Sequence, residues 1–385
     1  MLYGDGIHDD TAEIQKMLNV RGIVTLNRPG TYLITKTLII GSNTRLVLSP
    51  GARLLAAPMS RCALIENEHF AGGGRDENIG LEGGIFDGNC DEMGLDALYE
   101  AQHRLDDEYS PSLFKGKLIR LAHVTNIALE RLTVRNPVSY GIQIADVVGF
   151  TVRDIRFDYN WHFGTTDGVH INGPAHNGVI ENLYGTTNDD MVSLTTIDES
   201  HAQITKGEIA NVDIRNVSAS NGYSGVRLLT AEDLPLNNVR ISGVYGDYRH
   251  NAVLISQHNM RPGTRSFFDG IYIEHIHVRK SCTPLGEDCF RMWESENMRG
   301  PLIWIERGVE IGEAIIRDVS RNERSTVTNA PLIGLNAGVR IRRLVMENIS
   351  QINAEGVTAP YIENNADIEE LITRDVSALR TCAKQ

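Results

Sequence analysis

Short runs of alternating apolar and polar residues recur along the chain and give its strongest structural signal. Successive runs start 23 residues apart between Ile127 and Phe150, 27 apart between Val212 and Val239, and 32 apart from Val239 to Ile271. Alternation with period two is typical of a strand, and a repeat of roughly 20–50 residues is typical of a solenoid. The clearest runs are 127–134, 150–157, 212–217 and 239–244, with later copies at 271–278, 339–344 and 368–376.

These runs are not separated by amphipathic helices of usable length, which argues against an α/β fold. We therefore expect an all-β protein, a single-stranded right-handed parallel β-helix formed as one domain over residues 1–385. Residues 9–19, where Glu13 follows Asp10 by three positions, predict a capping helix. Three segments lack the repeat and are expected to form loops that line the sides of a binding groove: 88–117, 197–208 and 281–300. The first of them is expected to contain a helical stretch near 95–105.

Charge and cysteine usage narrow the possible partners. The chain has 37 basic and 50 acidic residues, a net charge of −13, which argues against nucleic acid or an anionic membrane as a partner. Its five cysteines lack the spacing of a zinc site, and no run of about 18 apolar residues predicts a membrane span. We expect a soluble protein, either cytoplasmic or secreted with a leader that is absent from this chain. The sequence leaves its oligomeric state open.

Two acidic sites lie one repeat apart, at Asp167 and at Asp189-Asp190. Asp167 and Asp190 are separated by 23 residues (190 − 167), so in a coil they would stack on neighbouring strands roughly 4.8 Å apart. Three converging carboxylates repel one another and shift one another's pKa, which is the arrangement that glycosidic bond cleavage needs. Two other interpretations stay open. The aspartates could shape a turn, or they could bind Ca²⁺ together with Asn172.

Several segments resemble the pectate-lyase-like β-helix superfamily, and within it glycoside hydrolase family 28, the polygalacturonases. The resemblance rests first on the N-terminal coils and on a Gly-Gly-x-x-Asp-Gly turn. Near the acidic sites, Thr165-Thr166-Asp167-Gly168 is similar to the Asn-Thr-Asp-Gly motif of the family, and Asn188-Asp189-Asp190 to its Gly-Asp-Asp motif. The N-terminal segments that carry the likeness are 4–15, 29–32, 46–52 and 83–88.

The resemblance implies separate catalytic roles for the three aspartates. Asp189 would be the general acid, and Asp167 and Asp190 would hold and deprotonate the attacking water. Room for that water implies inversion of configuration, with the acid and one partner separated by roughly 6.5–9.5 Å. The resemblance implies a carbohydrate substrate. We expect no cofactor for such a reaction, and no metal.

Two departures from the family put polygalacturonate in doubt as the substrate. Ser224 stands where the family has the histidine of Gly-His-Gly, and residues 251–256 lack both basic residues of Arg-Ile-Lys. Arg227, Arg249 and His250 are candidates to bind substrate in their place. His170, three residues after Asp167, is either a hydrogen-bonded structural residue or a substrate ligand. Trp161, Tyr140 and Tyr223 are candidates for stacking against a sugar face, with Trp161 expected to be exposed.

Two alternatives to an inverting glycosidase remain. In a polysaccharide lyase or epimerase on the same scaffold, Arg227, Arg249 or His170 would take the leading role and the aspartates could hold Ca²⁺. In a non-catalytic carbohydrate-binding β-helix, the missing family motifs would reflect lost catalysis, and sugar would bind without turnover.

Overall fold

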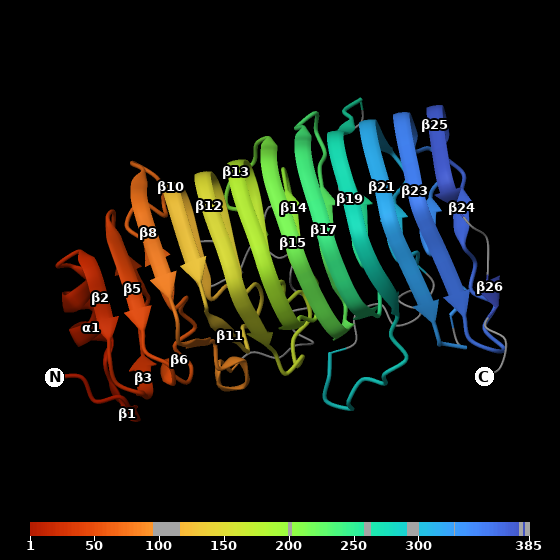
Figure 1. Ribbon diagram of the computed structural model, residues 1–385. Helices are drawn as coiled ribbons and strands as arrows, with labels where there is room; N and C mark the ends of the chain where they lie inside the picture. The colour runs from red at the N-terminus through yellow and green to blue at the C-terminus, as the bar shows by residue number, and fades with distance from the viewer. Residues whose placement is uncertain are drawn as a thin grey trace.

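The chain winds into a right-handed parallel β-helix, as the sequence predicts. The computed structural model describes residues 1–94, 116–198, 202–257, 263–290, 300–326, 328–376 and 380–381. All of its strands belong to one continuous sheet in which the paired strands are parallel. Successive coils lie side by side along one long axis, with the N-terminus at one end and the C-terminus at the other (Figure 1).

Each coil contributes to three faces, and long strands bend from one face to the next. The first, which we call the site face, contains the starts of the long strands β10 (Ile119–Glu130), β12 (Ile142–Asp158) and β13 (Val169–Thr186). Its short strands are β4 (Leu38–Ile40), β7 (Ile65–Asn67), β14 (Asp190–Thr195), β16 (Ser224–Leu229), β18 (Val253–Ser256), β20 (Ile303–Ile305), β22 (Ile333–Leu335) and β24 (Ile362–Asn364).

The other two faces complete each coil. Long strands bend across both: β15 (Ile209–Gly222), β17 (Leu236–Tyr248), β19 (Ser266–Lys280), β21 (Val309–Glu323), β23 (Arg340–Asn353) and β25 (Asp367–Val376). The second face begins with β2 (Gly22–Leu26), β5 (Thr44–Leu48) and β8 (Asp76–Glu82). The third comprises β1 (Asp5–Asp9), β3 (Gly30–Ile34), β6 (Ala52–Ala56), β9 (Ile85–Asp87), β11 (Thr133–Arg135) and β26 (Arg380–Thr381).

The register confirms the predicted stacking of the repeats. Ile127 pairs with Phe150, and Val212 pairs with Val239, which in turn pairs with Ile271. The run predicted over 127–134 is split, because β10 ends at Glu130 and β11 begins at Thr133. Strand β13 stands between β12 and β15, so the sequence runs that start at 150 and 212 are two coils apart.

The core lies inside the coil and is built from the inward half of each alternating strand. On the site face Val169, Val192, Val226 and Val253 occupy equivalent register positions, and each is fully buried. Burying one such side chain stabilises the fold by about 1.5–3 kcal/mol, so a stack of valines holds the register of neighbouring coils. One cluster of buried apolar residues extends from Ile14 to Ile349.

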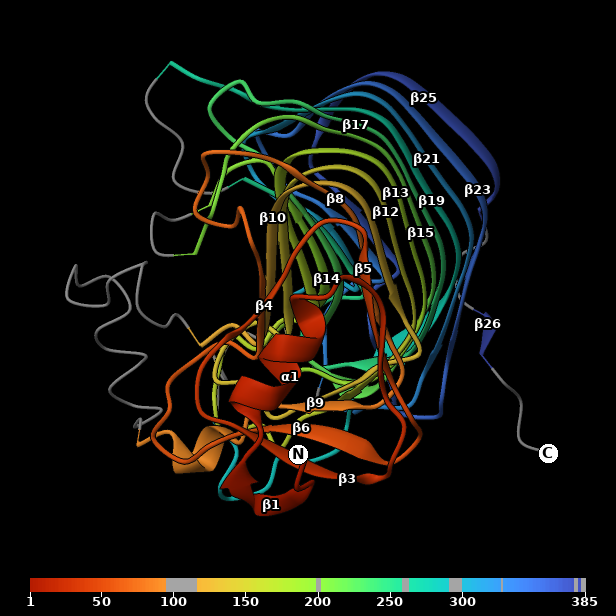
Figure 2. The same ribbon diagram turned by 90° about the vertical axis from the view of Figure 1, so that its left-hand side faces the viewer.

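Helix α1 (Thr11–Leu18) covers the N-terminal end of the coil, where Figure 2 shows it lying across the opening. Its buried residues include Ile14 and Leu18, so the predicted cap is confirmed. The capping-box interaction is not formed. The Asp10 carboxylate instead accepts hydrogen bonds from the backbone N–H groups of Tyr3 and Gly4, and Glu13 pairs with Lys16.

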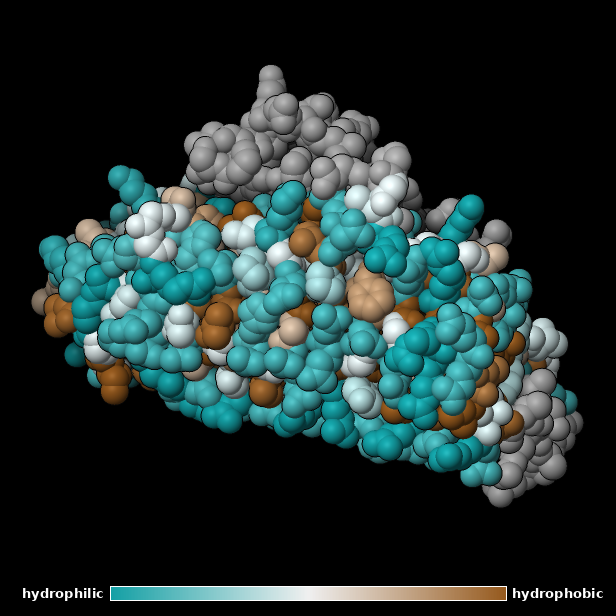
Figure 3. Space-filling model, turned by 90° about the horizontal axis from the view of Figure 1, so that it is seen from above, coloured by the Kyte–Doolittle hydropathy of each residue, from teal (hydrophilic) through white to brown (hydrophobic). Residues whose placement is uncertain are grey.

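Of the predicted loop segments, residues 88–94, 116–117, 197–198, 202–208, 281–290 and 300 are described, and they lie between strands of the coil. Segment 88–94 contains a 3₁₀ turn (Cys90–Glu92), and the helical stretch expected near 95–105 lies outside the described residues. From above, the surface is mostly hydrophilic, with apolar side chains in small separate patches (Figure 3). Among the described residues, no helix combines the length and the apolar character needed to cross a membrane.

Candidate active site

The three aspartates lie where the chain enters the strands of the site face. Register pairing aligns Asp167 and Asp190 in neighbouring coils, because the Gly168 N–H donates to the Asp190 carbonyl at 2.9 Å. Ser224 pairs with Asp190 in the next coil. The same register, carried one coil toward the N-terminus, places Tyr140 beside Asp167.

The carboxylates of Asp167, Asp189 and Asp190 converge, with one oxygen of each lying within 4.8 Å of the others. Asp167 and Asp190 are each only 3% exposed, and Asp189 is half-buried. The cluster is tighter than the family resemblance implies. The nearest oxygen atoms lie closer than the roughly 6.5–9.5 Å predicted between acid and base, a range that refers to whole carboxyl groups. The side chains bring the carboxylates closer than the sequence indicates.

Asp167 is held by hydrogen bonds to both of its oxygens. Its Oδ1 accepts from the backbone N–H of Asp190 at 3.2 Å, and its Oδ2 lies 2.6 Å from Nδ1 of His170. His170 occupies an outward position between the core residues Val169 and Ile171, so this contact places the Asp167 carboxylate on the outer side of the sheet. Burial raises the pKa of Asp167 well above its ordinary value, and the charge of Asp190 raises it further.

Asp190 faces Arg227 from the next coil. The guanidinium Nη1 lies 3.8 Å from Asp190 Oδ2, and Nε donates to Oγ of Ser256 at 3.1 Å. Burial raises the pKa of Asp190, and Arg227 partly offsets that rise. Burial alone would lower the pKa of Arg227, but the surrounding carboxylates, Asp190 foremost, raise it. Arg227 therefore stays cationic and limits the repulsion among the aspartates.

His170 is almost fully buried, and both ring nitrogens have partners. Nδ1 contacts Asp167, and Nε2 lies 3.2 Å from Nδ2 of Asn172 and 3.5 Å from Oδ2 of Asp198. Its ring stacks on Tyr140, with centroids 4.2 Å apart and planes 5° apart. Burial lowers the pKa of His170 to about 4. These contacts occupy both ring nitrogens of His170, which favours the structural alternative over a contact with the sugar.

A second group of predicted residues surrounds Arg249, one coil beyond Arg227. Its guanidinium lies 4.8 Å from the ring centre of Trp161 and 5.5 Å from that of Tyr223, and Nη2 donates to Asn188 Oδ1 at 2.7 Å. The ring of His250 stacks on that of Tyr223, with centroids 5.0 Å apart. Trp161 is half-buried rather than exposed. Burial lowers the pKa of Arg249 to about 10 and that of His250 to about 3.

Three residues near the acids were not among the candidates predicted from the sequence. Asn188 is fully buried and donates to the carbonyls of Phe163 and Phe290, which joins the acidic turn to the segment at 281–290. Following the register backwards reaches Tyr140, already a candidate from the sequence, and then Lys117, since 167 − 27 = 140 and 140 − 23 = 117 match the pairing of β13 with β12 and of β12 with β10. Asp198 carries no periodic signal. The missed residues are Lys117, Asn188 and Asp198.

The acidic cluster suits proton transfer better than Ca²⁺ binding. The proposed fourth ligand, Asn172, uses its Oδ1 to accept from Gln143 Nε2 and from the Ile204 N–H, and turns its Nδ2 toward His170. The Asn172 amide oxygen is therefore not free to complete a Ca²⁺ site with the aspartates. The cation of Arg227 beside Asp190 disfavours a second positive charge there.

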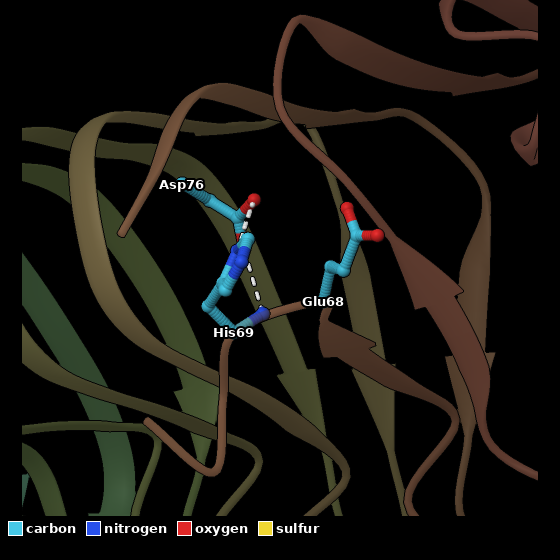
Figure 4. Close-up of side chains that lie close together, drawn as sticks. All are labelled: Glu68, His69 and Asp76. Carbon is cyan, nitrogen blue, oxygen red and sulfur yellow. Dashed lines mark hydrogen bonds and ion pairs between the residues drawn. The ribbon is translucent and has the colours of Figure 1, made fainter. Parts of the chain in front are cut away.

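Another acidic group, Glu68, His69 and Asp76, clamps a turn (Figure 4). Asp76 accepts four hydrogen bonds, two of them from the ring and backbone N–H of His69, as the dashed lines show. Ser42 and Asn67 donate the other two, and Glu68 pairs with Arg21. The Asp76 carboxylate already has a partner for each lone pair, so this group is structural.

Three solved structures show which proteins share this architecture. A family 28 exopolygalacturonase from Yersinia enterocolitica matches with a TM-score of 0.60 and 15% identity, over 97% of this chain and 76% of its own. The chain has the parallel β-helix fold of that enzyme. The A-module of a mannuronan C-5 epimerase from Azotobacter vinelandii matches with a TM-score of 0.59 and 12% identity, over 100% and 98%.

A surface adhesin of Streptococcus pneumoniae matches almost as well, with a TM-score of 0.57 and 15% identity over 98% of this chain and 91% of its own. No family model matches the sequence, and neither does any curated protein. A hydrolase, an epimerase and an adhesin therefore share the fold, so the likeness establishes architecture and the residues of the site must decide the chemistry.

Proposed function

We propose that the protein is a glycoside hydrolase that cleaves a glycosidic bond at the cluster of Asp167, Asp189 and Asp190. The observation that carries the proposal is the convergence of three carboxylates on two neighbouring coils, beside a cation and a histidine. Glycoside hydrolysis needs one carboxyl to protonate the leaving oxygen and another to activate water or attack the sugar. The parallel β-helix fold shared with a family 28 exopolygalacturonase is compatible with this assignment, and the arrangement of the acids carries it.

Exposure and hydrogen bonding favour particular roles for the aspartates. Asp189 is the most exposed of the three, so it can reach the glycosidic oxygen and act as the general acid. Asp167 and Asp190 are buried and fixed, which suits groups that position and deprotonate a water molecule. Hydrolysis inverts the anomeric configuration when a water molecule fits between the sugar and the base. Because the carboxylate oxygens lie close together, the anomeric configuration of the product is the property to measure. ¹H NMR of the first-formed anomer distinguishes inversion from retention.

The substrate we propose differs from plain polygalacturonate. Ser224 and the strand Val253–Ser256 lack the histidine, arginine and lysine of the family motifs. Arg227 is already engaged by Asp190 and Ser256, so it neutralises the site's own acids first. A glycan with a neutral sugar at the cleavage position, or an acidic one reached by Arg227 and Arg249, is the expected substrate.

The test is release of reducing sugar from a panel of plant and bacterial polysaccharides, with Asp189→Asn as the inactive control. Activity that disappears in the variant supports hydrolysis. An unsaturated product that absorbs in the ultraviolet would assign a lyase instead. Sugar binding without turnover by the wild type would assign a binding protein.

A further inference from the structure

The orientation of two buried amide side chains determines which nitrogen of His170 carries the proton. Gln143 lies one coil before His170 and at the same register position. Its Nε2 donates to the carbonyl oxygen of Ala202 at 2.7 Å, and a backbone carbonyl can only accept. The Gln143 side chain must therefore present its NH₂ group here, and the same NH₂ donates to Asn172 Oδ1 at 2.9 Å.

A second backbone group fixes Asn172 independently. The N–H of Ile204, which can only donate, points at Asn172 Oδ1 at 3.1 Å. The Asn172 NH₂ group must then face Nε2 of His170, 3.2 Å away. Nε2 has to accept that hydrogen bond, so the neutral ring carries its proton on Nδ1. Nδ1–H in turn donates to Oδ2 of Asp167 at 2.6 Å.

We propose that Gln143, Asn172 and His170 form a relay of hydrogen bonds that fixes the Nδ1–H tautomer of His170 and thereby holds Asp167 as the ionised, water-activating carboxylate. The proposal rests on the proposed function for the role of Asp167 alone. With its other oxygen accepting the Asp190 N–H, Asp167 has a donor at each oxygen, and such hydrogen bonds favour the charged form. His170 is a positioning residue because it acts through Asp167.

The relay opposes the effect of burial. Burial and the neighbouring charge of Asp190 raise the pKa of Asp167, which on their own would let it take up a proton and lose its ability to accept one from water. Asp198 faces Nε2 of His170 at 3.5 Å and favours the charged ring, whereas Arg227 and Lys117 disfavour it. Tyr140 covers the ring face. The hydrogen bond from Nδ1–H favours the ionised form and so opposes the rise in the pKa of Asp167 that burial and Asp190 cause.

The tautomer is tested by NMR without any substrate. The wild type is labelled with ¹⁵N-histidine, and the His170 signals are those that vanish in His170→Asn. We expect long-range ¹H–¹⁵N spectra at neutral pH to show a protonated Nδ1 and an unprotonated Nε2. An Nε2–H ring or a doubly protonated ring would overturn the relay. Asn172→Asp places an acceptor at Nε2, so it should move the proton to that nitrogen or charge the ring.

The consequence for catalysis is tested with two matched variants. His170→Phe keeps the stack on Tyr140 and removes the donor, so kcat should fall by about 10- to 100-fold with little change in KM. The acidic limb of its pH–rate profile should move to higher pH, because Asp167 then takes up a proton more readily. His170→Asn can place an amide N–H near the Nδ1 position and should recover most of the loss.

These outcomes separate the relay from the proposed function. If the wild type cleaves a glycan and His170→Phe is equally active with an unchanged pH profile, the relay is refuted and the hydrolase stands. If no glycan is cleaved, the NMR result still decides the tautomer, and the function is what fails.

Discussion

Replacing Asp76 with Asn should destabilise the fold without changing the chemistry of the site. Burial raises the pKa of Asp76, but the hydrogen bonds from Asn67, His69 and Ser42 outweigh it and lower the pKa from 3.8 to about 2. Asp76 is fully buried, so solvent screens these contacts little. At about 1.36 kcal/mol per pKa unit, the ionised carboxylate contributes on the order of 2 kcal/mol at pH 7.

Because the pKa of Asp76 is lowered in the fold, the predicted loss of stability depends on pH. A carboxyl whose pKa is lower in the fold than in the unfolded chain stabilises the fold above the unfolded value, and this stabilisation is lost as the pH falls through about 2. In the Asp76→Asn variant, the new amide also turns its NH₂ toward two of the four donors, which leaves them without acceptors. We therefore expect a loss of about 2 kcal/mol or more at pH 7 that shrinks below about pH 4.

Urea unfolding followed by circular dichroism measures this loss, as a lower midpoint at unchanged slope. Glu77→Gln is the matched control, since it neutralises the adjacent and exposed carboxylate and should shift stability by less than about 0.5 kcal/mol. The reasoning fails if Asp76→Asn is as stable as this control at pH 7, or if its deficit is as large at pH 2 as at pH 7. The kcat of the folded variant should match the wild type.

Three further predictions concern the site. Asp189→Asn keeps the shape of the side chain but removes the proton donor. Turnover, measured by reducing-sugar release, should fall by at least about 100-fold, while binding, measured by calorimetry, should survive. Turnover comparable to that of the wild type would assign the role of general acid to another residue. Arg227→Gln should raise the pKa of Asp190, since the guanidinium lowers it, and shift the acidic limb of the pH–rate profile upward. The same variant should weaken binding of anionic more than neutral oligosaccharides, and equal weakening of both would exclude a role in specificity. Polygalacturonate should be cleaved slowly or not at all by the wild type, and a rate equal to that of the best substrate would show that the missing family residues do not govern specificity.

The fold is predictable because each coil repeats the same physical requirement. Val169, Val192, Val226 and Val253 must all face the interior, and that alternation is visible in the sequence. The same periodicity predicts that Asp167 and Asp190 lie on neighbouring strands. Register arithmetic applied to the preceding coils extends the site to Tyr140 and Lys117.

Details set by irregular segments could not be predicted. The amide orientation of Asn172 depends on Ile204, in a loop without periodic pattern, and the role of His170 depends on that amide. Asp10 resembles a helix cap in the sequence, but the N-terminal segment folds back and offers it two backbone donors instead. The distance between carboxylates depends on side-chain conformation, which the repeat does not encode.

Coil lengths on the site face vary widely, although the register does not. Equivalent positions are 23 residues apart from His170 to Ser193, 34 from Ser193 to Arg227 and 50 from Leu254 to Trp304. Because each coil bonds mainly to its two neighbours, extra residues between equivalent positions leave the pairing of the stacked strands undisturbed. Directed evolution can therefore vary segments such as 202–208 and 281–290, provided that the backbone contacts at Ala202, Ile204 and Phe290 are kept. Such changes would alter which glycan the protein accepts and leave the acidic cluster unchanged.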